Sequence, residues 1–166
     1  MSQDGRQFRN ALGCFATGVC VVTTKDGASG GIGLTINSFT SVSLDPPLVL
    51  WCLDKSSDRF ATFTQADRFC IHVLDERARE ASQRLARKGG GVLEIDEFAQ
   101  DVSGLPILNH ALAHFVCERH AVHDAGDHVI ILGAVRDFSS AASGRPLVYF
   151  RGAYRMLEAF EPGENP

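Results

Sequence analysis

The stretch GLTINSFTSVSLDPP, residues 33–47, lies between two apolar segments and mixes strand-like residues with short polar ones. Hydroxyl and amide side chains recur at nearly every second position. Two interpretations fit this pattern. In the first, the hydroxyls satisfy the backbone of an irregular, bulged strand. In the second, backbone amides near Thr35 and Ser38, with the side chains of Asn37 and Ser38, bind a flat, neutral heterocycle, which Gly30, Gly31 and Gly33 allow to come close.

The sequence on both sides of this stretch predicts mostly strands. Short apolar or β-branched runs indicate strands over residues 19–24, 30–35, 48–53, 68–74, 111–123, 128–138 and 147–155. Helices are predicted at the N-terminus, where Phe8, Leu12 and Phe15 share one face, after a Ser56 or Ser57 N-cap, and over residues 76–87. Residues 92–109 are predicted to be a loop. Because the strands follow one another through short turns, we expect an antiparallel barrel with peripheral helices.

Length and composition suit one globular domain over residues 1–157, followed by an acidic tail over residues 158–166. The 166 residues are 45% hydrophobic, and the net charge of −4 is not gathered in blocks, which argues against nucleic acid and anionic membranes. We find neither the apolar core of a signal peptide nor a membrane-spanning run. The five cysteines form no CxxC pair and predict mostly buried, reduced thiols in a cytoplasmic protein.

The segment DKSSDRF, residues 54–60, has two interpretations. It is either a strand end followed by a capped helix with solvated cations, or a phosphate site. For the second, free amides at a helix N-terminus would act with the serine hydroxyls and with Lys55 and Arg59. Arg84, on the next predicted helix, could add positive charge.

Other chemistries find little support. The histidine spacings do not place ligand pairs on one face, and HExxH, GxSxG, P-loop and GxGxxG motifs are all missing. We therefore predict no metal site. His128, after the turn at Gly126, either satisfies turn carbonyls or binds a ligand amide at the barrel rim. Hydride transfer through a flavin would need no protein nucleophile, because the cofactor carries the chemistry.

Five segments together resemble the flavin reductase-like family of split β-barrel FMN-binding proteins: FATGVCVVTT, GLTINSFTSVSLDPPLVLWCL, RFCIHVL, GDH and LVYFRGAYRML. The resemblance covers residues 8–157. It implies a mostly β fold, a six-stranded antiparallel Greek-key split β-barrel with peripheral α-helices. It also implies a homodimer with each flavin near the interface.

The resemblance also assigns residues to each part of the ligands. Around the isoalloxazine ring it places Gly31, Ile32, Gly33, Leu34, Thr35, Asn37 and Ser38. Along the ring and the ribityl chain it places Cys52, Leu53 and Asp54. Near the phosphate it places Ser57, Asp58 and Arg59, with Arg84 and Leu85 closing that side. The positions associated with the nicotinamide cofactor are His128, Tyr149, Phe150, Arg151 and Gly152.

The implied activity is an NAD(P)H:flavin oxidoreductase that passes hydride from NADH, or alternatively NADPH, to FMN or FAD. Reduced flavin would then diffuse to a partner monooxygenase, and His128 would position the nicotinamide rather than act as a base. Residues 88–97 form a segment that is shorter and richer in glycine than the usual family segment. This difference bears on substrate access and on whether the protein prefers FMN or FAD. The alternatives are a flavin-binding electron carrier or redox sensor without a nicotinamide site, and a flavin-free interaction module.

Overall fold

The structure is a computed structural model that describes residues 5–27 and 30–157. Strands dominate it, and every ladder between named strands is antiparallel, as predicted. The helices are α1 (Gly5–Leu12), α2 (Phe60–Gln65), the 3-10 turn η1 (Glu76–Ala78) and α3 (Arg79–Leu85). The strands are β1 (Thr17–Gly18), β2 (Cys20–Asp26), β3 (Gly30–Ile36), β4 (Thr40–Leu44), β5 (Pro47–Asp54), β6 (Arg68–Leu74), β7 (Phe98–Gln100), β8 (Pro106–Leu108), β9 (Ala111–Ala125), β10 (His128–Ser140), β11 (Val148–Phe150) and β12 (Ala153–Arg155). The tail predicted for residues 158–166 lies outside the described residues.

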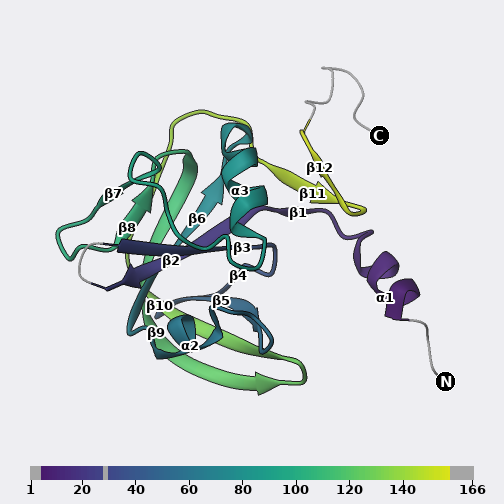
Figure 1. Ribbon diagram of the computed structural model, residues 1–166, viewed down its shortest axis with the longest axis horizontal. Helices are drawn as coiled ribbons and strands as arrows, with labels where there is room; N and C mark the ends of the chain where they lie inside the picture. Colours follow the sequence, from purple (N-terminus) through teal and green to yellow (C-terminus); the bar gives the residue numbers. More distant parts are fainter. Residues whose placement is uncertain (1–4, 28–29, 158–166) are drawn as a thin grey trace.

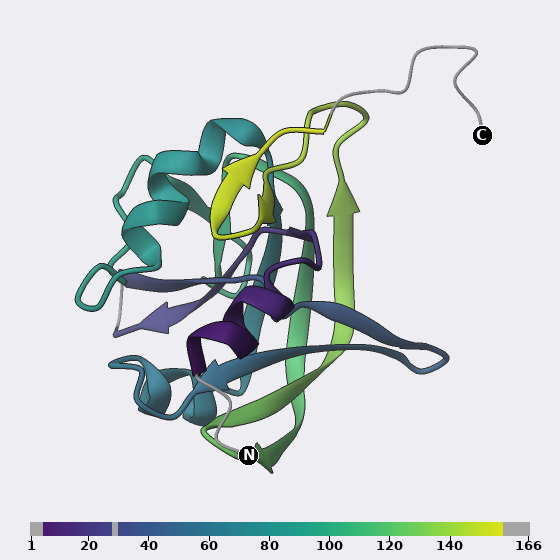
Figure 2. The same ribbon diagram turned by 90° about the vertical axis from the view of Figure 1, so that its right-hand side faces the viewer.

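The largest sheet has seven strands in the order β3-β2-β6-β9-β10-β5-β4. The expected count of six strands is therefore not matched, and no ladder among the described residues joins β3 to β4 and closes the sheet. The extra strand is β4, which comes from the polar stretch of residues 33–47. Figure 1 shows how the sheet curls, with α3 lying across it, and Figure 2 shows the β4–β5 hairpin reaching out from the body.

Two sequence predictions were wrong at the level of single elements. Residues 147–155 form the hairpin β11–β12 instead of one strand, because Arg151 (φ 49°) and Gly152 (φ 76°) reverse the chain. Residues 92–109 contain the hairpin β7–β8 instead of a loop alone. Both elements have only three residues per strand, so their local periodicity was too short to identify them.

The main core lies between β5, β6, β10 and α2. Trp51 is fully buried, and its ring makes edge contacts with Phe63 at 5.4 Å and with Phe69 at 5.9 Å between centroids. Through Phe63 the short helix α2 is anchored to the sheet. A second cluster, around Val21, Leu85 and Leu147, joins α3 to the start of β2 and to β11. Aromatic and aliphatic burial of this kind is the main source of stability in such a domain.

His72, on β6, is a fully buried polar residue with both ring nitrogens engaged. Its Nδ1 lies 3.1 Å from the Val21 carbonyl, and its Nε2 lies 3.1 Å from the Leu108 amide, so Nδ1 donates and Nε2 accepts. Burial lowers the pKa of His72 to about 3. The neutral ring therefore ties β8 to the large sheet.

The cysteines partly follow the prediction. Cys20, Cys70 and Cys117 are buried, whereas Cys52 is partly buried and Cys14 is exposed; all five are free thiols. Burial raises the pKa of Cys20 and Cys117 to about 12, which keeps these thiols protonated. No described helix is long and apolar enough to cross a membrane.

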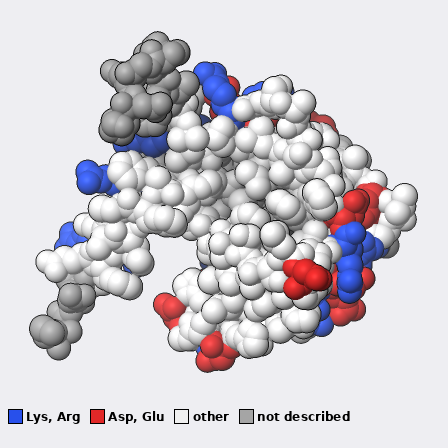
Figure 3. Space-filling model, turned by 180° about the vertical axis from the view of Figure 1, so that it is seen from behind, with Lys and Arg blue, Asp and Glu red and all other residues white. Residues whose placement is uncertain are grey.

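The N-terminal helix is present but buries none of its residues. It ends at Leu12, so Phe15 lies beyond it, and Phe8, Leu12 and Phe15 are 58%, 58% and 78% exposed. We call residues 5–16 the N-terminal arm. Figures 1 and 3 show the arm standing away from the body of the molecule. The apolar face predicted from the sequence therefore has no partner within the described part of the chain.

Candidate functional site

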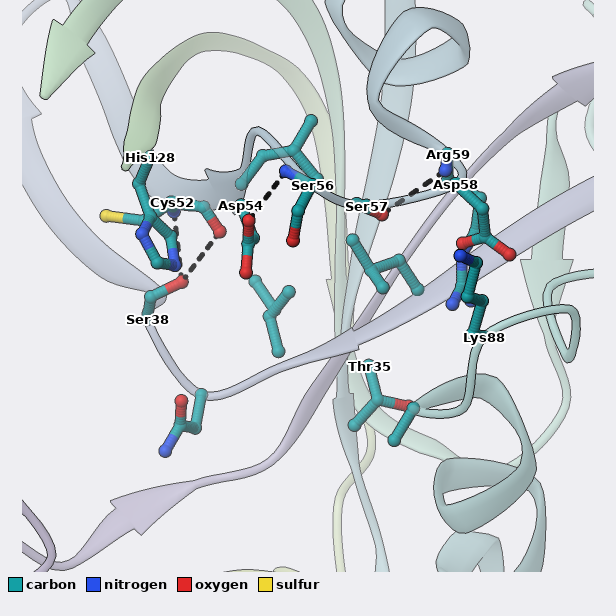
Figure 4. Close-up of a pocket in the computed structure, with 15 residues that line it drawn as sticks. Thr35, Ser38, Cys52, Asp54, Ser56, Ser57, Asp58, Arg59, Lys88 and His128 are labelled. Atoms are coloured by element: carbon teal, nitrogen blue, oxygen red, sulfur yellow. Dashed lines mark hydrogen bonds and ion pairs between the residues drawn. The ribbon is translucent and has the colours of Figure 1, made fainter. Parts of the chain in front are cut away.

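A pocket of about 420 Å³ opens at the edge of the large sheet where β3 and β5 end and β10 begins. Its wall consists of residues 34–38, 52–54 and 56–59, with Ala86, Lys88 and His128. These segments meet because His128 pairs with Asp54 in the β5–β10 ladder. Figure 4 shows His128 and Ser38 at one end of the pocket and the charged side chains of Asp58, Arg59 and Lys88 at the other.

The hydroxyls of Thr35 and Ser38 both bind main-chain groups. Thr35 Oγ1 donates to the Ser82 carbonyl at 2.8 Å, and Ser38 Oγ accepts the Cys52 amide at 2.9 Å. These two hydroxyls therefore bind backbone, as the first interpretation expects, but the backbone belongs to α3 and β5 and not to their own segment. Asn37 differs, because its side chain makes no hydrogen bond to another described residue and borders the pocket. Its amide is therefore available to a ligand.

The glycines of β3 approach the protein's own side chains closely. A Cβ atom added at Gly31 would lie 2.6 Å from Pro106 Cγ and 2.8 Å from Leu93 Cδ1, and one at Gly33 would lie 3.0 Å from Leu93 Cδ2. A side chain at either position would therefore require Leu93 or Pro106 to shift. In this structure, then, Gly31 and Gly33 let β3 pack closely on Leu93, after α3, and on Pro106 of β8.

The prediction of free amides at a helix N-terminus was wrong. Helix α2 begins at Phe60, with Arg59 at the N-cap position, not at Ser56 or Ser57. The Ser56 amide donates to Asp54 Oδ1 at 2.7 Å, and the Arg59 amide donates to Ser57 Oγ at 3.2 Å. The Ser56 hydrogen bond also lowers the pKa of Asp54. An anion at this end of the pocket would therefore meet hydroxyls and side-chain cations rather than a row of free amides.

Arg59 is 4% exposed, and its guanidinium holds three main-chain carbonyls together. Its Nη1 donates to the carbonyls of Gly33 at 3.0 Å and Leu85 at 2.7 Å, and its Nη2 donates to that of Arg87 at 2.7 Å. A guanidinium suits this role because its donors are fixed in one plane. Arg59 thus ties β3, the end of α3 and the following loop together, and most of its donors are occupied.

Asp58 completes this junction. Its Oδ1 accepts Arg59 Nε at 3.0 Å, and its Oδ2 accepts the Gly89 amide at 2.6 Å. The Gly89 amide, with a smaller effect of Arg59, lowers the pKa of Asp58. The loop between α3 and residue 91 is therefore fixed to the start of α2.

Lys88, at the tip of this loop, borders the pocket and makes no hydrogen bond or ion pair with another described residue. Arg84 lies elsewhere: its Nη1 donates to the Val92 carbonyl at 2.6 Å, and its Nη2 pairs with Glu97. The cation that borders the first pocket is therefore Lys88, whereas the expected Arg84 does not line it. The sequence offered no signal that could separate Lys88 from its neighbours, because the path of the glycine-rich loop decides which side chain reaches the pocket.

A second cavity, of about 1230 Å³, adjoins the first. It lies between the N-terminal arm and the β11–β12 turn, and it shares Asn37 and His128 with the first pocket. His128 therefore stands between the two spaces. Its Nδ1 lies 2.7 Å from Asp127 Oδ1, and its side chain is 42% exposed, so the other face of the ring remains open to ligands.

The sequence-predicted residues are distributed over these two spaces. The first pocket contains Leu34, Thr35, Asn37, Ser38, Cys52, Leu53, Asp54, Ser57, Asp58, Arg59 and His128. The second contains Tyr149, Arg151 and Gly152. The walls of neither include Gly31, Ile32, Gly33, Arg84, Leu85 or Phe150. The sequence did not point to Ile36, Ala86 and Lys88 in the first pocket, or to residues 9–15 and Thr17 in the second.

The described residues form no group of three or more His, Cys, Asp or Glu side chains that could hold a metal ion.

Comparisons with known proteins agree with one another. The sequence pattern of the family described as "Flavin reductase like domain" matches residues 12–158. The chain is 47% identical over 152 residues to the FMN reductase (NADH) SmoA of Agrobacterium fabrum, covering 92% of this chain and 86% of that protein. It is 41% identical to the stachydrine N-demethylase reductase subunit Stc3 of Rhizobium meliloti, with 91% of this chain and 65% of that protein covered. The NADH:FAD oxidoreductase SgcE6 of Streptomyces globisporus superimposes with a TM-score of 0.84 at 32% identity, over 98% of this chain and 92% of that one.

Proposed function

The chain belongs to the flavin reductase-like family, and from this premise we propose that it is an oxidoreductase that reduces FMN or FAD with NADH. The observation that carries the proposal is the pair of adjoining spaces that share Asn37 and His128. Hydride transfer needs two ring systems in contact, and two connected sites can hold them face to face. A structure of SgcE6 in complex with NAD and FAD fragments, 33% identical to this chain, is known.

The first pocket fits a flavin with a phosphate group. Its volume of about 420 Å³ lies within the range of small-molecule sites. Leu34 and Leu53 supply apolar surface to its wall, and the Asn37 amide can bind polar edges of a ring. Lys88 supplies positive charge at one end of the pocket, and the Ser56 hydroxyl, beside Asp54, supplies a further donor. A bound flavin would supply the hydride acceptor, and the protein would supply binding and orientation.

The remaining site residues have proposed roles that follow from this arrangement. We propose that Asp58 and Arg59 position the loop that carries Lys88, and that Thr35 and Ser38 fix the pocket wall. His128 positions the nicotinamide at the boundary of the two spaces. Gly31, Ile32 and Gly33 support the pocket from behind, where they lie against Leu85, Gly91 and Leu93, and Arg84 holds the Val92 carbonyl of the same loop.

The wider biological setting is also a proposal. We propose one catalytic domain over residues 1–157 with the split-barrel architecture of the family, acting in the cytoplasm and passing reduced flavin by diffusion to a partner monooxygenase. Relatives described as reductase subunits of flavin-dependent monooxygenases support this partner. The exposed Phe8, Leu12 and Leu44, with relative exposures of 58%, 58% and 93%, support a homodimer.

The test is to mix the protein with NADH and excess FMN, FAD or riboflavin in air and to follow NADH absorbance. Rapid consumption that requires flavin would support the reductase and would rank the flavins. Tight flavin binding without NADH oxidation would contradict the proposal and favour the electron carrier or redox sensor. A protein that neither binds flavin nor oxidises NADH would contradict both.

A further inference from the structure

The N-terminal arm forms one wall of the second cavity. Residues 9–15 border that space, together with Thr17 and with Arg151 and Gly152 of the β11–β12 turn. The arm is fixed to this turn, because the Arg151 amide donates to the Gly13 carbonyl at 2.8 Å. Most of the wall of the second cavity therefore comes from the two ends of the described chain, and Asn37 and His128 complete it.

The second cavity is lined by positive side chains and by no negative ones among the described residues. Its described lining includes the side chains of Arg9 and Arg151 and no Asp or Glu. The first pocket differs, since Asp54 and Asp58 line it together with its cations. Figure 3 shows the same property on the surface of the described part of the arm, which carries blue side chains and no red ones. Because the charged residues in this lining are arginines, the cavity favours an anionic ligand.

Both arginines are available to such a ligand. The guanidinium of Arg9 makes no hydrogen bond or ion pair with another described residue, and Arg9 is exposed in the last turn of α1. Arg151 has φ 49°, a strained conformation for a residue other than glycine, and its guanidinium carbon lies 5.3 Å from the centroid of Phe150. Nearby, Thr17 Oγ1 is buried without a hydrogen-bond partner among the described residues. A buried polar atom without a partner calls for an explanation, and a ligand or water in the cavity would supply one.

We propose that the N-terminal arm is a wall of the nicotinamide dinucleotide site, in which Arg9 acts with Arg151 to bind the pyrophosphate while His128 and Asn37 border the nicotinamide. This inference rests on the proposed function and adds Arg9 and the arm to it. Guanidinium groups suit a pyrophosphate, because they can bind two of its oxygens at once. Arg9 is thus a positioning residue for the reductant.

The test compares two reductants and two arginines of the same helix. NADH carries a pyrophosphate, whereas 1-benzyl-1,4-dihydronicotinamide is neutral and lacks it. Arg9→Gln should raise the Michaelis constant for NADH by about tenfold, the effect of losing one charge-assisted contact, and leave the rate with the neutral donor unchanged. Arg9→Lys should recover part of the loss. Arg6→Gln removes the same charge at a position that does not border the cavity, and it should leave both donors unaffected.

A binding measurement separates this inference from the proposed activity. ADP-ribose contains the pyrophosphate but no nicotinamide, and its binding can be titrated by calorimetry without any turnover. The wild-type protein should bind ADP-ribose. Arg9→Gln should raise the dissociation constant for ADP-ribose by about tenfold, and Arg6→Gln should leave it unchanged. Three results would overturn the role of Arg9. Arg6→Gln could weaken ADP-ribose binding as much as Arg9→Gln does, or Arg9→Gln could impair the reaction with both reductants equally. In the third, Arg9→Gln would bind ADP-ribose and use NADH as the wild type does. Failure of the wild type to oxidise NADH while ADP-ribose still binds through Arg9 would instead count against the proposed reductase activity.

Discussion

Asp58 accepts the main-chain amide of Gly89 at 2.6 Å, across a separation of 31 residues. This bond, with those of Arg59, fixes the loop after α3 against the start of α2. Lys88 precedes Gly89 in that loop and borders the first pocket. The position of the pocket's available cation therefore depends on a carboxylate and a guanidinium that belong to another element.

Replacing Lys88 with Gln should weaken FMN binding by about tenfold, equivalent to about 1.4 kcal/mol, because an ammonium–phosphate contact is lost at a partly solvated site. Riboflavin has no phosphate and should bind the variant as it binds the wild type. Fluorescence titration of both flavins measures this difference. The neighbouring Arg87→Gln, whose side chain does not line the pocket, is the matched control. Equal weakening of both flavins would contradict a phosphate contact.

Replacing Arg59 with Leu should lower the free energy of unfolding by about 3 kcal/mol or more, since three carbonyls and the Asp58 carboxylate would lose a buried partner. Arg59→Lys should recover only part of this, because an ammonium cannot span the same carbonyls. Urea unfolding followed by fluorescence gives both values. Arg87→Leu, at an exposed side chain, should change stability by about 0.5 kcal/mol or less. A fully stable Arg59→Leu would show that the junction does not depend on this guanidinium.

Replacing His128 with Ala should raise the Michaelis constant for NADH several-fold and leave FMN affinity close to that of the wild type. The reason is its position between the two spaces, with Nδ1 directed at Asp127. Steady-state kinetics and a flavin titration on the same preparation separate the two effects. A collapse of FMN affinity with an unchanged NADH constant would assign His128 to the flavin instead.

Acid should destabilise the protein through His72. The pKa of this side chain is about 3 in the folded protein and about 6.5 when unfolded, so between these values the unfolded state binds the additional proton. The stability that the neutral ring provides is present above pH 6.5 and is lost as the pH falls toward 3. Between pH 6.5 and 5 the loss should be about 2 kcal/mol.

The variant His72→Asn tests this, because Asn can still donate to the Val21 carbonyl but does not titrate. Its unfolding free energy should start lower at pH 7.5 and then depend less on pH between 6.5 and 5. The exposed His123→Asn is the control and should keep the wild-type dependence. A slope in His72→Asn equal to that of the wild type would assign the acid sensitivity to other groups.

Local sequence identified most of the fold. The run RFCIHVL became β6 with the predicted bounds, and the Asp-rich turn at Gly126 connects β9 and β10 as expected. Runs of β-branched residues and the turns between them are local signals, so one chain segment suffices to find them. The three-residue strand β7 carries too little periodicity and was missed, whereas β11 and β12 were predicted as one continuous strand.

The sequence by itself determined an antiparallel β domain with neutral polar residues at strand ends, and the family resemblance pointed to the residues that meet in the first pocket. Tertiary structure alone decided which of those groups are free for a ligand. Arg59 is held by carbonyls 26 and 28 residues away, and Thr35 by one 47 residues away, whereas Asn37, Lys88 and Arg9 have no such partner among the described residues. Hydrogen bonds across such separations depend on strand register and on the path of loops, and neither is encoded in the spacing of neighbouring residues.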